Sequence, residues 1–125
     1  MTDSDASCPG ILVVDDDPDI RESLREVLQD EGYEVNCVSN GREALDYLQT
    51  GPRPCVILLD LMMPVMDGWQ FRVEQKKVAG IADIPLIVIT ATGKRPVLID
   101  ADELVMKPLD LNRLFAAIDR YCDAD

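Results

Sequence analysis

Short apolar runs alternate with segments of helical periodicity along the chain, and this alternation constrains the fold more than any other feature. The runs are rich in Val, Ile and Leu, as strands buried on both faces of a parallel sheet are. They span residues 11–14, 35–38, 56–59, 86–89 and 104–106. Strands that alternate with helices favour a doubly wound α/β fold, with right-handed crossovers and helices on both faces of the sheet.

The segments between the runs carry the end signals of helices. Asp17 is placed as the N-cap of a first helix, Pro18 as its first residue, and Gly32 lies just past its end. A second helix is predicted over 42–49, where Gly and Pro follow, and a third from about residue 67 towards 78.

The last part of the chain predicts one long helix and leaves little room for another. Residues 91–102 contain Gly93 and Pro96, so a helix before the fifth strand should be short or absent. The final helix follows Asp110 and is expected to bury one apolar stripe. That stripe consists of Leu111, Leu114, Phe115 and Ile118.

The composition describes one compact domain and excludes several classes of function. A chain of 125 residues can bury roughly two-thirds of the surface that it exposes when unfolded. Its 24 acidic and 12 basic side chains argue against nucleic acid, because phosphate binding depends on Lys and Arg. No apolar stretch approaches the ~20 residues that cross a bilayer. The first ten residues carry two Asp and no Lys, Arg or apolar block, so we do not expect them to act as a secretory signal peptide. We expect a cytoplasmic protein without membrane insertion, with a domain over 10–122 and tails at 1–9 and 123–125.

Cysteine and histidine usage narrows the chemistry further. The chain has no histidine and no CxxC pair, which argues against zinc sites and against Cys–His or Ser-His-Asp nucleophiles. Free thiols are expected at Cys8, Cys37, Cys55 and Cys122. Any chemistry must therefore depend on carboxylates, hydroxyls or lysines.

Polar side chains stand where the predicted strands end. Asp15 and Asp16 follow the first run, Asp60 the third, Thr90 the fourth and Lys107 the fifth. Ligands of an open parallel sheet bind outside the carboxyl ends of its strands, so these residues should converge at one edge.

Three carboxylates held close together repel one another unless a cation relieves the repulsion. Mg²⁺ prefers carboxylate, carbonyl and water oxygens, so a metal site is predicted at Asp15, Asp16 and Asp60. Beside such a metal, a carboxylate can act as nucleophile towards a phosphoryl group while a lysine stabilises the charge on its oxygens. The hydroxyl of Thr90 would then contact the bound phosphoryl group.

The segments VVDDDPD, LLDLMMPVMDG, ITA and KP, in this order at the strand ends, resemble the receiver domain of bacterial response regulators. The resemblance covers residues 10–121 and implies a flavodoxin-like sheet of strand order 2-1-3-4-5. It also assigns roles to the residues at the strand ends. These are the phosphoacceptor Asp60, the Mg²⁺ ligands Asp15, Asp16, Asp60 and the carbonyl of Met62, the switch hydroxyl Thr90 and the phosphoryl contact Lys107.

The resemblance implies a function in two-component signalling or a phosphorelay. Receivers take a phosphoryl group from a phosphohistidine of a histidine kinase or histidine phosphotransfer protein, and later hydrolyse their own acyl phosphate. They catalyse no reaction other than these two on themselves. Phosphorylation then shifts the domain between two conformations that a downstream protein partner distinguishes.

Two departures from the family pattern keep alternatives open. Leu104 stands where many receivers have Tyr or Phe, and the connection from Thr90 to Lys107 is several residues shorter than usual. The chain could therefore be a pseudo-receiver, an interaction module that works without phosphorylation. An enzyme of the haloacid-dehalogenase phosphatase class is a second alternative, because Asp15 and Asp17 fit its DxDx[TV] pattern. However, Asp19 occupies the Thr or Val position.

Overall fold

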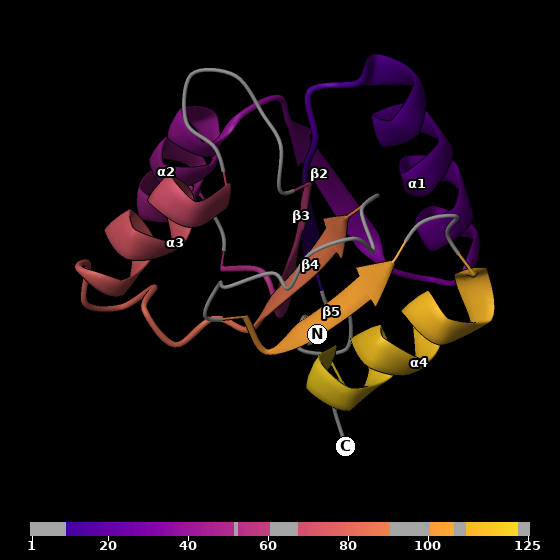
Figure 1. The fold of residues 1–125 in the computed structure, drawn as a ribbon. Helices are drawn as coiled ribbons and strands as arrows, with labels where there is room; N and C mark the ends of the chain where they lie inside the picture. Colours follow the sequence, from indigo (N-terminus) through magenta and orange to yellow (C-terminus); the bar gives the residue numbers. More distant parts are fainter. Residues whose placement is uncertain (1–9, 52, 61–67, 91–100, 107–109, 123–125) are drawn as a thin grey trace, which may run out of the picture.

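The computed structural model describes residues 10–51, 53–60, 68–90, 101–106 and 110–122. These residues form a five-stranded parallel sheet of order β2-β1-β3-β4-β5 with helices on both faces (Figure 1). The strands are β1 Gly10–Val14, β2 Glu34–Val38, β3 Val56–Asp60, β4 Leu86–Thr90 and β5 Glu103–Met106. The predicted fold class is confirmed, and every predicted strand is correct to within one residue at each end.

The described residues contain the helices α1 Pro18–Asp30, α2 Gly41–Thr50, α3 Gly68–Lys76 and α4 Leu111–Cys122. Asp17 caps α1 as predicted, since its carboxylate accepts a hydrogen bond from the Asp19 N–H at 2.9 Å. Gly32, with φ of 98°, follows the end of α1 in a conformation that favours glycine. The region predicted to hold a short or missing helix is 91–102, and its residues 91–100 lie outside the described residues, as do both predicted tails.

Two details of the predicted helices are wrong. The third helix ends at Lys76, short of Val78, because the N–H groups of Lys77 and Val78 bond three residues back and tighten the chain into a turn. Leu111, predicted to be buried, is 39% exposed. Leu111 is the first residue of α4. A helical side chain covers the helical turn before it, and no turn of α4 precedes Leu111.

Alternate residues of the central strands face opposite helix pairs. Ile11 and Val13 of β1 pack in a buried cluster with residues of α1 and α4, a side that we call the α1–α4 face. Leu12 and Val14 pack in a second cluster with residues of α2 and α3, the α2–α3 face (Figure 1). Because both clusters are buried, the two faces hold the sheet rigidly and so position the residues at its carboxyl edge.

The α2–α3 face also contains a buried polar group. Gln75 is fully buried and Arg72 is 5% exposed. The Arg72 guanidinium donates to Gln75 Oε1 at 2.8 Å and to Asp102 Oδ2 at 3.3 Å. Gln75 in turn donates to the carbonyls of Ile81 and Ile84, and Asp102 accepts from the N–H of Leu86. These bonds tie α3 to the starts of β4 and β5.

The sequence-based prediction of free thiols is confirmed at Cys37 and wrong at Cys55. Cys37 is a free thiol, and its partial burial raises its pKa despite the nearby Arg25 and Arg21. Cys55 is disulfide-bonded, so the prediction is wrong for this residue. Composition alone cannot reveal such a bond, since it depends on which chain segments the fold brings together.

None of the helices within the described ranges has the length and apolarity needed to cross a membrane.

Candidate functional site

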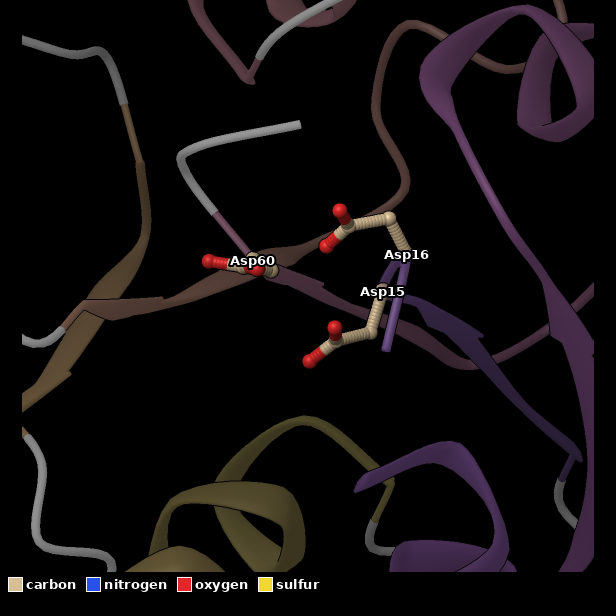
Figure 2. A group of neighbouring side chains, drawn as sticks. All are labelled: Asp15, Asp16 and Asp60. Atoms are coloured by element: carbon tan, nitrogen blue, oxygen red, sulfur yellow. The ribbon is translucent and has the colours of Figure 1, made fainter. Parts of the chain in front are cut away.

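Three aspartates meet at the carboxyl ends of the two central strands. Val14 of β1 is paired with Leu59 of β3, so the residues that follow, Asp15 and Asp60, lie side by side. Asp16 comes next in the chain. Each of the three offers a carboxylate oxygen, and these oxygens all lie within 4.8 Å of one another (Figure 2). The convergence that the sequence predicts for these three residues is thus observed.

The three carboxylates differ in their access to solvent. Asp15 is 5% exposed, Asp60 is partly buried and Asp16 is exposed. Figure 2 shows Asp15 and Asp16 leaving the chain in different directions from the end of β1, with Asp60 beside them at the end of β3. The cluster therefore extends from the buried Asp15 to the exposed Asp16.

The buried Asp15 is held at three points. Its carboxylate Oδ1 accepts a hydrogen bond from the Asp17 N–H at 2.9 Å. Its main-chain carbonyl accepts one from Nη1 of Arg21, in the first turns of α1, at 2.7 Å. Its N–H continues the β1–β2 ladder by donating to the Val38 carbonyl. The loop that carries the acidic pair is thus fixed to both β2 and α1.

The geometry of the cluster fits a divalent cation. Mg²⁺ binds oxygen at roughly 2.0–2.1 Å, so two oxygens on opposite sides of one ion are about 4 Å apart. Oxygens within 4.8 Å of one another need only small side-chain rotations to share an ion. The negative charges of three neighbouring carboxylates also favour a cation between them.

The other residues predicted for this site are described only in part. Thr90 is the last residue of β4 and pairs with Met106, the last residue of β5. Asp60 pairs with Ile89, directly before Thr90, so the backbones of Asp60 and Thr90 end neighbouring strands at the same edge. Met62 and Lys107 lie outside the described residues.

Arg21 is the residue of this region that sequence reasoning missed. The available sequence signal was its position shortly after the acidic pair. Helix α1 begins directly at the loop that carries Asp15 and Asp16, and Arg21 lies in its first turns. An arginine there can turn back to the carbonyls of the loop, yet helical periodicity alone places it on a solvated surface.

The strand order and the place of the acidic cluster define a class of protein. An order of 2-1-3-4-5 with a ligand site between the ends of β1 and β3 is that of flavodoxin-like doubly wound domains. The family model of the response regulator receiver domain matches residues 11–119. The chain belongs to this family, the receiver domains of two-component signal transduction.

Individual relatives agree with this assignment. Response regulator MprA of Mycolicibacterium vanbaalenii is 40% identical over 111 residues, which make up 85% of this chain and 47% of that protein. The chain thus spans about half the length of the curated relatives that it matches.

Solved structures show the same likeness. The signal receiver domain of a histidine kinase from Syntrophus aciditrophicus is 31% identical, with a TM-score of 0.85 over 93% of this chain and 91% of that chain. The receiver domain of sensor histidine kinase PA1611 from Pseudomonas aeruginosa, with magnesium coordinated in its active site cleft, is 24% identical and shares the fold. Its TM-score is 0.86 over 93% of this chain and 98% of that chain.

Proposed function

We propose that this receiver domain accepts a phosphoryl group on Asp60 from a partner phosphohistidine, in a Mg²⁺-dependent reaction, and signals by conformational change. The observation that carries this proposal is the group of carboxylates of Asp15, Asp16 and Asp60 at the ends of β1 and β3. A nucleophilic carboxylate beside two metal-binding carboxylates is the arrangement that phosphoryl transfer to aspartate requires.

Each residue has a distinct task in the proposed reaction. A carboxylate oxygen of Asp60 attacks phosphorus, and the bond from phosphorus to the donor's histidine nitrogen breaks as the new P–O bond forms. The nitrogen keeps the electron pair and takes up a proton. Asp15, Asp16, Asp60 and the carbonyl of Met62 would hold Mg²⁺, which would supply positive charge to offset the negative charge of the carboxylates and phosphoryl oxygens.

Thr90 and Lys107 are proposed to contact the phosphoryl group. The ladder register supports this role, because Thr90 ends β4 beside the strand of Asp60, and Lys107 directly follows Met106, the partner of Thr90. The lysine ammonium would stabilise charge on the phosphoryl oxygens, and the threonine hydroxyl would donate a hydrogen bond to one of them. Water later hydrolyses the acyl phosphate, which restores the Asp60 carboxylate and releases phosphate.

The partners follow from the family. We propose a histidine kinase or a histidine phosphotransfer protein as the donor, and a downstream protein as the receiver of the signal. The curated relatives are response regulators about twice as long as the part of them that this chain matches. The rest of their length indicates where such a signal is used. The domain would catalyse only its own phosphorylation and dephosphorylation, and would work in the cytoplasm.

Intact mass spectrometry after incubation with acetyl phosphate and Mg²⁺ tests the proposal. We expect a single phosphoryl increment that is lost in Asp60→Asn and in the presence of a chelator. Asp46→Asn, which removes an exposed carboxylate from α2, is the matched control and should be labelled like the wild type.

Two outcomes would contradict the proposal and favour another function. Absence of the increment in the wild type, with Mg²⁺ present, would favour a pseudo-receiver that binds its partner without phosphorylation. Repeated turnover of p-nitrophenyl phosphate would favour a phosphatase of the haloacid-dehalogenase class.

A further inference from the structure

The main-chain carbonyl of Asp15 is bonded to a charged side chain, which is unusual for the end of a strand. Nη1 of Arg21 reaches back from α1 to this carbonyl at 2.7 Å, a short distance that is typical of a charged donor. Arg21 is partly buried, so solvent competes only weakly for its guanidinium. The planar guanidinium also holds its direction better than a lysine ammonium would.

This bond acts on both members of the acidic pair. The carbonyl of Asp15 belongs to the peptide unit that joins Asp15 to Asp16, and that unit is a rigid plane containing the Cα atoms of both residues. A donor that fixes the carbonyl therefore fixes the orientation of the plane from which both side chains depart. The hydrogen bond from the Asp17 N–H to Oδ1 then fixes the orientation of the Asp15 carboxylate relative to this plane.

We infer that Arg21 is a positioning residue for the metal site, which holds the Asp15–Asp16 peptide so that both carboxylates face Asp60. The inference rests on the proposed Mg²⁺ site of Asp15, Asp16 and Asp60. Arg21 touches neither the metal nor the phosphoryl group in this proposal, and it acts only through the peptide that it holds.

A purely structural role for the guanidinium is less consistent with the contacts of α1. The helix is joined to β2 by the Cys37 thiol, which donates to the main-chain carbonyl of Arg21 at 3.9 Å, and by the buried Leu24 and Leu28. These contacts do not involve the guanidinium. Its removal should therefore change the acidic loop more than it changes the attachment of the helix.

Removal of the Arg21 guanidinium should change the metal affinity in opposite directions, depending on whether the guanidinium acts through its charge or by positioning the ligands. A positive guanidinium near the site repels a cation, so its removal would tighten metal binding if charge alone mattered. If Arg21 orients the ligands, its removal weakens binding, as does the loss of other partners that orient metal ligands. The sign of the change thus distinguishes the two roles.

The experiment measures Mn²⁺ affinity of the unphosphorylated protein by the EPR signal of free Mn²⁺, since Mn²⁺ accepts the same oxygen ligands as Mg²⁺. We expect Arg21→Met to lower the affinity by about tenfold. Arg21→Lys keeps the charge but loses the planar donor, and should lower it by a smaller factor. Arg42→Met, which removes an exposed charge from α2, is the control and should stay within about twofold of the wild type.

Equal or tighter Mn²⁺ binding by Arg21→Met would overturn the inference and leave the proposed function intact. Absence of Mn²⁺ binding in the wild type would overturn the proposed metal site, and this inference with it. Thermal unfolding without metal identifies a variant that fails to fold. In that case Arg21→Lys decides alone, since wild-type affinity in a folded Arg21→Lys protein contradicts the need for the planar donor.

Discussion

The two faces of the sheet are covered in different ways, and β5 shows the difference within one strand. Val105 points to the α1–α4 face and is 6% exposed, whereas its neighbour Leu104 is 40% exposed. On the α1–α4 face the apolar cover extends to the edge strand, since Val105 packs with Leu114 and Ile118 of α4. Among the described residues, no helix provides the same cover for Leu104.

The α2–α3 face compensates with polar contacts near β4 and β5. Arg72 and Gln75 are buried there, and their hydrogen bonds with Asp102 and nearby carbonyls occupy the region between α3 and the strand starts. Such groups are tolerated in a core only when they are hydrogen-bonded. One face is thus stabilised by apolar area and the other, at its edge, by a specific set of hydrogen bonds.

Truncation of a buried leucine on the α1–α4 face should have the largest effect. Leu114 is fully buried, so Leu114→Ala is expected to lower the free energy of unfolding by about 3 kcal/mol. Leu104→Ala is the matched variant on the other side of β5 and should cost less than about 1 kcal/mol. Urea denaturation measures both. Equal losses would mean that Leu104 is as well covered as Leu114, and the contrast between the faces would disappear.

Removal of the buried arginine should have the next largest effect. Arg72→Met keeps most of the side-chain volume but leaves the oxygen of Gln75 without its buried donor, which should cost about 2 kcal/mol. Arg113→Met, an exposed position on α4, should cost less than about 0.5 kcal/mol. A loss in Arg72→Met as small as in this control would show that the polar contacts do not stabilise the α2–α3 face.

On the α1–α4 face, the hydroxyl of Tyr33 joins the start of β2 to α4 by donating to Asp119 at 2.7 Å. Partial burial and this bond raise the pKa of Tyr33 from 10.0 to about 12. The unfolded chain therefore loses this proton first, and the free energy of unfolding should fall as pH rises from about 10 to about 12. Tyr33→Phe should cost about 1 kcal/mol at neutral pH and reduce this alkaline loss. An unchanged alkaline profile in Tyr33→Phe would contradict the assignment.

The smallest effect is expected at the start of α2, on the α2–α3 face. The Ser39 N–H and hydroxyl both donate to the Glu43 carboxylate at 2.8 Å, which lowers the pKa of Glu43 below its usual 4.5. This contribution is present above pH 4.5 and is lost as pH falls through the lowered pKa. Glu43→Gln should cost about 0.5 kcal/mol at neutral pH and flatten the acid end of the stability profile. Glu26→Gln on α1 is the control, and an equal change there would contradict the contribution of the Ser39–Glu43 bonds.

Local sequence patterns predicted the strands well because the three central apolar runs, those of β1, β3 and β4, are buried on both faces. They also placed Asp15, Asp16 and Asp60 together, since the ends of parallel strands share one edge. The burial of Arg72 was not predictable in this way, because it depends on Asp102, which only the fold brings close. Arg21 was missed for a different reason, because its partner is a nearby main-chain carbonyl and helical periodicity alone places the side chain on a solvated surface.

The register of β4 and β5 has a consequence for how fast the sheet assembles. Ile87 pairs with Glu103, whereas Val14 pairs with Leu59, so the β4–β5 ladder closes a loop less than half as long. Closing the shorter loop costs about 1 kcal/mol less in chain entropy than closing the longer one. Because non-local pairing slows folding, we expect the edge strand β5 to pair with β4 sooner than β1 pairs with β3.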